Sequence, residues 1–486
     1  MAKQQAVAAG NQARPAAADR GKLIRALIVL AVGGIIWFLP PIGGLEPAAM
    51  HLTAIFVATI LGLILQPLPQ GAVVLLGVAI TAITGTLSIG DTMKGFSDAT
   101  VWLIVSAFLF ARGFIKTGLG RRIAYLLVRR FGKSTLGLGY ALAFADVALA
   151  PATPSNTARG GGILFPVIRS LASSLGSEPG PTARRIGAYL MFNGFVICQV
   201  TSALFLTGVA PNSLIVKLAK ENFDYTITWM GWFWAALVPG LVSVLAMPYL
   251  VFKLFDPELK RSPEAPEMAR KELEKMGPMT LGEKGMLAVF LLTLLLWATG
   301  QWTNINATAV ALGGVATLLV LGVIEWQDVL SEKGAWDALA WFGGLVGLAS
   351  GLSKLKVIDV LATWLKGSLG GVSSWTLGFL LVVLAYVFVH YFIASMTAHA
   401  TAFYVPLALV AISLGAPAPL VLLVLGFMNS LNATTTHYGS GPAPVFFGSG
   451  YIDQATWWRC GLIVCLANLA IWLTVGSVWW KVIGLW

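Results

Sequence analysis

A short polar segment, Pro151 to Arg159, carries the residues best suited to chemistry in this chain, and hydrophobic sequence flanks it on both sides. It reads P-A-T-P-S-N-T-A-R, so a run of Ser155, Asn156 and Thr157 lies between two prolines and an arginine. Short hydroxyl and amide side chains donate hydrogen bonds. At a helix N-terminus they add to unpaired backbone N–H groups and to the positive end of the helix dipole. The segment is therefore suited to hold an anionic group.

A second segment repeats this pattern about 240 residues further along the chain. Ser395 to Pro406 reads S-M-T-A-H-A-T-A-F-Y-V-P, and Ser155 to Pro166 reads S-N-T-A-R-G-G-G-I-L-F-P. Serine, threonine, alanine and proline coincide in one register, with Arg159 set against His399. For one isolated run, bonding of Ser and Thr to carbonyls of their own helix is the simpler interpretation. Two matched runs beside prolines instead predict a site for a molecule with a carboxylate at each end.

The composition predicts an all-α polytopic membrane protein. The chain has 486 residues, of which 57% are hydrophobic and only 11% are charged, and its mean hydropathy is +0.81. Such a chain has too little polar surface to cover a soluble globule. The net charge of +11 reflects Lys and Arg retained in cytoplasmic loops rather than nucleic-acid binding. The three cysteines lie in apolar segments and are expected to pack in the core rather than to form disulfides or bind metal.

The apolar runs predict eleven transmembrane helices and two re-entrant hairpins, with the two polar segments as hairpin tips. The expected spans are 23–41, 50–67, 71–88, 98–119, 186–216, 228–255, 285–300, 306–324, 337–353, 419–449 and the residues from 456 onward. The hairpins are expected at 134–172 and 373–413. The spans 186–216 and 419–449 are interrupted by glycine and proline, near 207–211 and 441–444, and are expected to be broken helices.

The order of these elements repeats, which predicts two halves of inverted topology, 23–255 and 285–486. Residues 1–22 are expected to form a disordered cytoplasmic tail, and 256–284 a cytoplasmic linker with a helical patch rich in Glu and Lys. With the tail inside, most Lys and Arg fall on the inner side. The sequence therefore predicts a multi-pass protein of the cell (inner) membrane with a cytoplasmic N-terminus.

Three motifs carry a resemblance to a known family: A-P-A-T-P-S-N-T-A-R-G-G-G-I, S-M-T-A-H-A-T-A and G-S-G-P-A-P-V-F-F-G-S-G-Y. The chain after the tail resembles the divalent anion:sodium symporters. Within that family it is similar to bacterial citrate/succinate and tartrate/succinate antiporters and to plastid 2-oxoglutarate/malate translocators. The resemblance implies a homodimer in which a transport domain slides against a scaffold as an elevator, with no cofactor. The substrate-binding positions it implies are Ser155, Asn156, Thr157, Gly208, Val209, Ser395, Met396, Thr397, Ser440 and Gly441.

One departure from the sodium-coupled relatives predicts exchange without sodium. The resemblance implies that an asparagine in each tip belongs to a cation site, but Met396 stands in the second tip, and a thioether is a poor ligand for a hard cation. We expect Arg159 and His399 to be charge-compensating residues in place of sodium. The alternative is that Arg159 pairs with Asp146 while His399 packs as a neutral ring. Succinate, malate, fumarate and 2-oxoglutarate are the expected substrates; sodium-coupled symport, or exchange of citrate or tartrate, is the alternative.

Other functional classes fit the sequence less well. A membrane-embedded enzyme could arrange His390, His399 and His437 around a metal, but their spacing matches no helical metal motif and the inverted repeat would stay unexplained. A channel is less consistent with broken helices that face one central site. The sequence therefore predicts a carrier, with no enzymatic activity, no metal and no cofactor.

Overall fold

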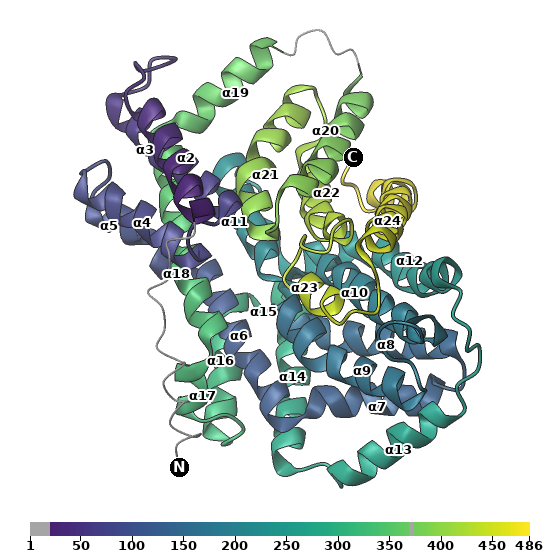
Figure 1. Cartoon of the computed structure of the whole chain (residues 1–486). Coiled ribbons are helices and arrows are strands. Elements are labelled where there is room, and N and C mark those ends of the chain that lie inside the picture. The colour runs from purple at the N-terminus through teal and green to yellow at the C-terminus, as the bar shows by residue number, and fades with distance from the viewer. Residues whose placement is uncertain (1–19, 369–373) are drawn as a thin grey trace, which may run out of the picture.

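The computed structural model describes residues 20–368 and 374–486, and these ranges are built of helices (Figure 1). The expected tail lies outside the described residues as far as residue 19, whereas residues 20–22 already belong to the first helix. Within the described ranges, ten helices are long and apolar enough to cross a membrane. The prediction of an all-α polytopic membrane protein is confirmed.

A helix is present in each range that was expected to span. The first half contains α2 (Arg20–Trp37), α3 (Pro47–Leu65), α4 (Gln70–Ile83), α5 (Ile89–Met93), α6 (Ala99–Thr117), α7 (Leu119–Phe131), α8 (Thr135–Leu149), α9 (Phe165–Ser174), α10 (Gly187–Leu204), α11 (Ala210–Phe223) and α12 (Trp229–Phe255). The segment between the halves contains α13 (Glu264–Met276). The second half contains α14 (Leu281–Ala298), α15 (Gly300–Thr303), α16 (Ala307–Val320), α17 (Trp326–Ser331), α18 (Lys333–Lys354), α19 (Val357–Ser368), α20 (Trp375–Val389), α21 (Met396–Ser413), α22 (Ala418–Leu431), α23 (Ala443–Phe447) and α24 (Gln454–Val482).

The elements that hold the two polar tips lie toward opposite ends of the molecule. In Figure 1, α8 and α9 lie in the lower part beside α7, whereas α20 and α21 lie in the upper part below α19. The amphipathic helices α7 and α19 were not predicted, because neither forms a continuous apolar run. They hold equivalent places, each between a long helix and a hairpin.

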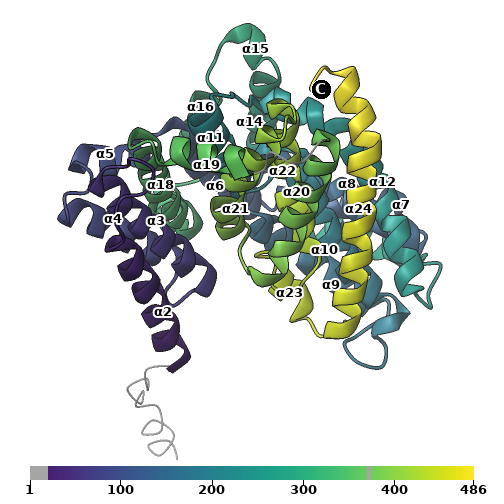
Figure 2. The same cartoon turned by 90° about the horizontal axis from the view of Figure 1, so that it is seen from above.

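The helices form two groups that meet along α11. Figure 2 shows α2, α3, α4 and α5 at one edge with α18, and α24, α12 and α8 at the other. Helix α10 lies at the centre of the second group, where every one of its residues is buried among α8, α12 and α22. A helix that is apolar on all sides is stable only in such surroundings. Helix α11, which follows the break after α10, contacts both α18 and α21.

A buried ion pair fastens α7 to the start of α14. Arg122 Nε lies 2.5 Å from Glu283 Oε1, and its Nη1 donates to the carbonyl of Gly277 at 2.9 Å. Glu283 also closes a capping box with Thr280, which fixes where α14 begins. Both charged side chains are almost fully buried. The linker is thereby held against the first half.

Replacing Glu283 with Gln should lower the unfolding temperature of the purified protein clearly. It leaves the Arg122 cation buried without a carboxylate, and breaking a buried pair costs roughly 3 to 5 kcal/mol. Glu267→Gln is the matched control, because its pair with Arg270 is exposed and should contribute much less. Thermal unfolding of both variants in the same detergent measures the difference. Equal unfolding temperatures would show that the buried pair does not fasten the linker.

Candidate functional site

The two polar tips begin their helices with the same capping geometry. Ser155 Oγ accepts from the N–H of Ala158 at 3.1 Å, and Ser395 Oγ accepts from the N–H of Ala398 at 3.2 Å. The carbonyls of both serines also accept from the N–H four residues on, each at 2.9 Å. A capping serine uses its oxygen as an acceptor, so its hydroxyl proton can still be donated. Each tip therefore presents hydroxyl and first-turn N–H donors.

The first tip continues into a wide, π-helical turn over Thr157–Leu164. The three consecutive glycines in this turn let it lie close to other elements. A Cβ on Gly160 would lie 2.9 Å from Cys198 Sγ, and one on Gly161 would lie 3.4 Å from a Val445 methyl group. π-Helical turns are frequent at functional sites. Here the turn is packed between α10 and the second broken span.

The structure brings the predicted positions of both tips and both broken spans together. Asn156 Nδ2 lies 3.6 Å from Met396 Sδ, which links the first tip to the second. Met396 also packs with Val209 and with Ala433, one residue from each broken span. A third contact joins Thr157 to Gly441, where an added Cβ would meet Thr157 Oγ1 at 1.9 Å. Four segments far apart in the sequence therefore meet at one place.

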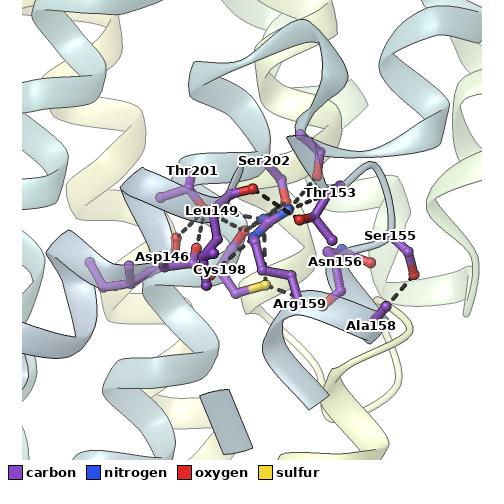
Figure 3. A network of polar contacts seen from close by, with 12 residues as sticks. Asp146, Leu149, Thr153, Ser155, Asn156, Ala158, Arg159, Cys198, Thr201 and Ser202 are labelled. Carbon is purple, nitrogen blue, oxygen red and sulfur yellow. Dashed lines mark hydrogen bonds and ion pairs between the residues drawn. The ribbon is translucent and has the colours of Figure 1, made fainter. Parts of the chain in front are cut away.

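The side chain of Arg159 points into a shell of oxygen atoms (Figure 3). The side chain is fully buried, and its Nε lies 3.0 Å from Asp146 Oδ1. Its two terminal nitrogens donate to oxygens of the first tip, α10 and the first broken span: the carbonyls of Thr153 at 2.8 Å, Gly208 at 2.7 Å and Cys198 at 3.2 Å, and the hydroxyls of Thr201 at 3.2 Å and Ser202 at 3.0 Å. The guanidinium thus joins the hairpin to the broken span.

This geometry favours the alternative interpretation, in which Arg159 pairs with Asp146. Asp146 lies beside the guanidinium and also accepts a hydrogen bond from the Thr201 hydroxyl. An ionised carboxylate at this distance balances the charge of the arginine. Asp146 therefore pairs with Arg159 in the absence of substrate, and the charge-compensating role of Arg159 stays a prediction.

His399 holds the equivalent place in the second half. Its Nε2 lies 2.8 Å from the carbonyl oxygen of Tyr386, which precedes it by 13 residues, as Asp146 precedes Arg159. Its Nδ1 lies 2.9 Å from Asn429 Oδ1 on α22, so this basic residue too joins a hairpin to a broken span. The ring is fully buried and stands edge-on to His390, with centroids 4.9 Å apart. Oxygens thus face both ring nitrogens of His399.

Three residues near the second tip have buried polar groups without partners, and two of them, Asn432 and Thr436, were not predicted to belong to the site. Both side-chain polar atoms of Asn432, Thr436 Oγ1 and Ser440 Oγ are buried, and within the described part of the chain they have no hydrogen-bond partner. All three residues belong to the break of the second broken span, whereas only Ser440 had been assigned to the site. The sequence signal was the polar run N-A-T-T-T-H within an apolar span. Buried donors and acceptors without partners are what an incoming polar ligand can satisfy.

Two of the three histidines considered for a metal, His390 and His399, lie side by side, whereas His437 has a different partner. His437 accepts from Trp458 Nε1 at 2.9 Å, while His390 Nε2 lies 2.8 Å from the Gly439 carbonyl oxygen. Among residues 20–368 and 374–486, no group of three or more His, Cys, Asp or Glu side chains is placed to hold a metal ion.

Comparison with known proteins places this arrangement in a family. A family model described as "Sodium:sulfate symporter transmembrane region" matches residues 20–486. The chain belongs to this family. It is therefore a membrane transporter rather than an enzyme, and the resemblance drawn from the tip motifs is confirmed.

Relatives and a solved structure match over nearly the whole chain. The "Putative malate transporter YflS" of Bacillus subtilis is 51% identical over 96% of this chain and 97% of its own. "Dicarboxylate transporter 1, chloroplastic" of Arabidopsis thaliana is 44% identical over 96% of this chain and 84% of its own. The crystal structure of the Alcanivorax borkumensis YdaH transporter shares the fold, with a TM-score of 0.56 and 14% identity over 95% of this chain and 98% of that one.

A double-mutant cycle on Asp146 and Arg159 tests whether the pair holds the first tip in place. Asp146→Leu and Arg159→Met should each lower the unfolding temperature strongly, because each leaves one buried charge alone, at a cost of roughly 3 to 5 kcal/mol. The double variant should be more stable than either single variant, since no isolated charge remains. Thermal unfolding of the four proteins in detergent measures this. Additive losses would show that the two side chains act independently.

Proposed function

We propose that this chain exchanges C4 and C5 dicarboxylates, such as succinate, malate, fumarate and 2-oxoglutarate, across the membrane without sodium. The contact between Asn156 and Met396 carries the proposal, because it joins two capped helix starts that each offer donors to one carboxylate. Relatives named as malate and dicarboxylate transporters support the substrate class. Citrate or tartrate, with more polar groups, is the second candidate.

The residues at the tips suit a dianion. Thr157 is exposed at the surface of the first tip, and Ser155 and Ser395 are partly exposed, so a ligand can reach them. The amide of Asn156 donates only to a thioether in this structure, which is a weak acceptor, and a carboxylate would replace it favourably. Thr397 and Ser440 are buried, and within the described part of the chain the Ser440 hydroxyl has no hydrogen-bond partner. Hydrogen bonds to charged groups stabilise more than neutral ones.

The surroundings of Arg159 support independence from sodium. Three carbonyl oxygens, two hydroxyls and a carboxylate surround its guanidinium. Oxygen donors of this kind are the ligands that hard cations prefer. In this chain the guanidinium of Arg159, which is part of the hairpin, occupies these oxygens, so they are not open to a free sodium ion. Met396 supplies sulfur where the resemblance implies an asparagine.

Charge compensation of the substrate then falls to His399. Asp146 balances Arg159 before any substrate binds, whereas His399 has no carboxylate among its hydrogen-bond partners. Oxygens face both of its ring nitrogens, an arrangement that accepts a proton on each. A protonated His399 would leave the empty carrier charged and the loaded one closer to neutral. Movement of the empty carrier would be costly, and this enforces exchange.

The remaining parts of the proposal concern movement and orientation. The group around α10 would slide against the α2–α5 group as an elevator within a homodimer, with the two hairpins re-entrant from opposite sides. The N-terminus and α13 would face the cytoplasm, where α13 carries much of the exposed charge.

A cysteine placed at residue 270, in α13, should then react in intact cells only with permeant reagents. Labelling of that cysteine by an impermeant reagent would reverse the orientation.

Transport in proteoliposomes tests the exchange directly. Vesicles loaded with unlabelled succinate should take up labelled succinate equally well in sodium, potassium or choline buffer, because no free cation is required. Vesicles without internal dicarboxylate are the control and should take up almost none. Uptake into these empty vesicles driven by an inward sodium gradient would assign the chain to the sodium-coupled symporters instead.

The close contact between Thr157 and Gly441 gives a second test. Gly441→Ala should abolish most exchange, because its new methyl group would overlap Thr157 Oγ1 and push the first tip away from the broken span. Gly162→Ala is the matched control, because Gly162 lies in the same hairpin as Thr157 and an added Cβ there meets nothing within 4 Å. Initial rates of labelled succinate exchange should separate the two variants. Normal exchange by Gly441→Ala would place the substrate elsewhere.

A further inference from the structure

A groove lies at the edge of the molecule formed by α2, α3 and α4 (Figure 2). It is a groove of about 700 Å³ whose lining is almost entirely apolar. None of the residues described in α2 is buried. The groove is therefore open toward the surroundings of the protein, which for this chain is the membrane.

One face of α2 lines this groove from end to end. The lining positions recur at single residues or adjacent pairs spaced by three or four, as one side of a helix requires: Lys22 and Leu23, Ala26, Val29 and Leu30, Gly33 and Gly34, and Trp37. With a rise of 1.5 Å per residue, the distance from Lys22 to Trp37 is about 22 Å. One leaflet of the hydrocarbon core is about 15 Å thick. The groove is long enough to hold a whole acyl chain from one leaflet.

Small residues keep the groove open. On α3 the lining includes Ala54, Ala58 and Gly62, which are spaced by four and lie on one face of the helix. Gly33 allows α2 to approach α3 closely, since a Cβ there would lie 2.9 Å from Ala58 Cβ. At Gly34 an added Cβ would meet nothing within 4 Å. Gly34 thus faces open space within the groove.

The two ends of the groove differ in character. At one end Lys22 is exposed, close to Arg20 and Arg25 on the same helix, and within the described residues none of the three forms an ion pair. Arg25 instead donates to the carbonyl of Leu65 at the end of α3. At the other end Trp37 stacks on His51, with ring centroids 3.9 Å apart. Tryptophan at the second end is typical of a membrane interface.

We propose that this groove is a binding site for an anionic phospholipid, whose phosphate lies at Arg20 and Lys22 and whose acyl chain lies along α2 as far as Gly34. Basic residues just outside the hydrocarbon core attract anionic headgroups. This charge favours a lipid over a helix from a second copy, because three cations that form no ion pair within the described residues would repel the same residues of that copy. Bound lipid would cover the otherwise weakly packed α2.

Native mass spectrometry of the full delipidated chain tests the site, with phosphatidylglycerol and the phosphatidylcholine of identical acyl chains as probes. Lipid binding is counted on the monomer peak, so loss of a dimer cannot imitate loss of lipid. Gly34→Phe should fill the groove and weaken binding of both lipids about tenfold, a change expected from the loss of a few buried methylene groups. Gly313→Phe is its control, since Gly313 is another exposed glycine with open space around it.

The headgroup preference is tested separately. The double variant Arg20→Glu with Lys22→Glu should bind phosphatidylglycerol about tenfold more weakly and leave phosphatidylcholine binding unchanged. Lys271→Glu with Lys284→Glu makes the same change of net charge on other exposed lysines and should preserve the preference. If Gly34→Phe binds lipid like Gly313→Phe, the proposal is wrong. A monomer–dimer shift in Gly34→Phe with unchanged lipid count would identify the groove as an interface between copies, which also overturns it.

Discussion

The buried guanidinium of Arg159 is the constraint on which the first half depends. An arginine enclosed by protein at membrane depth is tolerated only when every donor is paired and its charge is balanced. Asp146 supplies the charge, and the carbonyls of Thr153 and Gly208 supply acceptors. Those two carbonyls are available because the helices are interrupted at these residues. The breaks in the hairpin and in the span therefore satisfy the arginine as much as they shape the site.

In the second half, His399 occupies the position equivalent to Arg159 and makes hydrogen bonds to equivalent elements. His399 reaches back 13 residues to Tyr386 and across to Asn429, just as Arg159 reaches back to Asp146 and across to α10. Its partners are neutral oxygens rather than a carboxylate. The two halves are therefore similar in path and unequal in charge, because the first tip holds an arginine paired with a carboxylate and the second holds a histidine among neutral oxygens.

The sequence predicted the elements better than it predicted side-chain directions. Apolar length located the spans, prolines located the first tip, and the repeat of S-x-T-A located the second. The direction of Arg159 could not be predicted, since half of the oxygens that accept from it are main-chain carbonyls, which have no sequence signature. Asp146 had been considered as its partner, but distance along the chain alone could not decide it. The amphipathic helix α7 was missed because its charged face conceals its apolar one.

The oxygen shell around Arg159 also restricts the order in which the chain can enter a membrane. Asp146 arrives in the same hairpin, but the acceptors on α10 lie 39 to 43 residues beyond the arginine. A hairpin released into lipid before α10 would expose guanidinium donors to hydrocarbon, at a cost of roughly 2.5 to 3.5 kcal/mol for an unpaired arginine. We therefore expect the hairpin to leave the insertion machinery together with α10, once the acceptors on α10 have been synthesised.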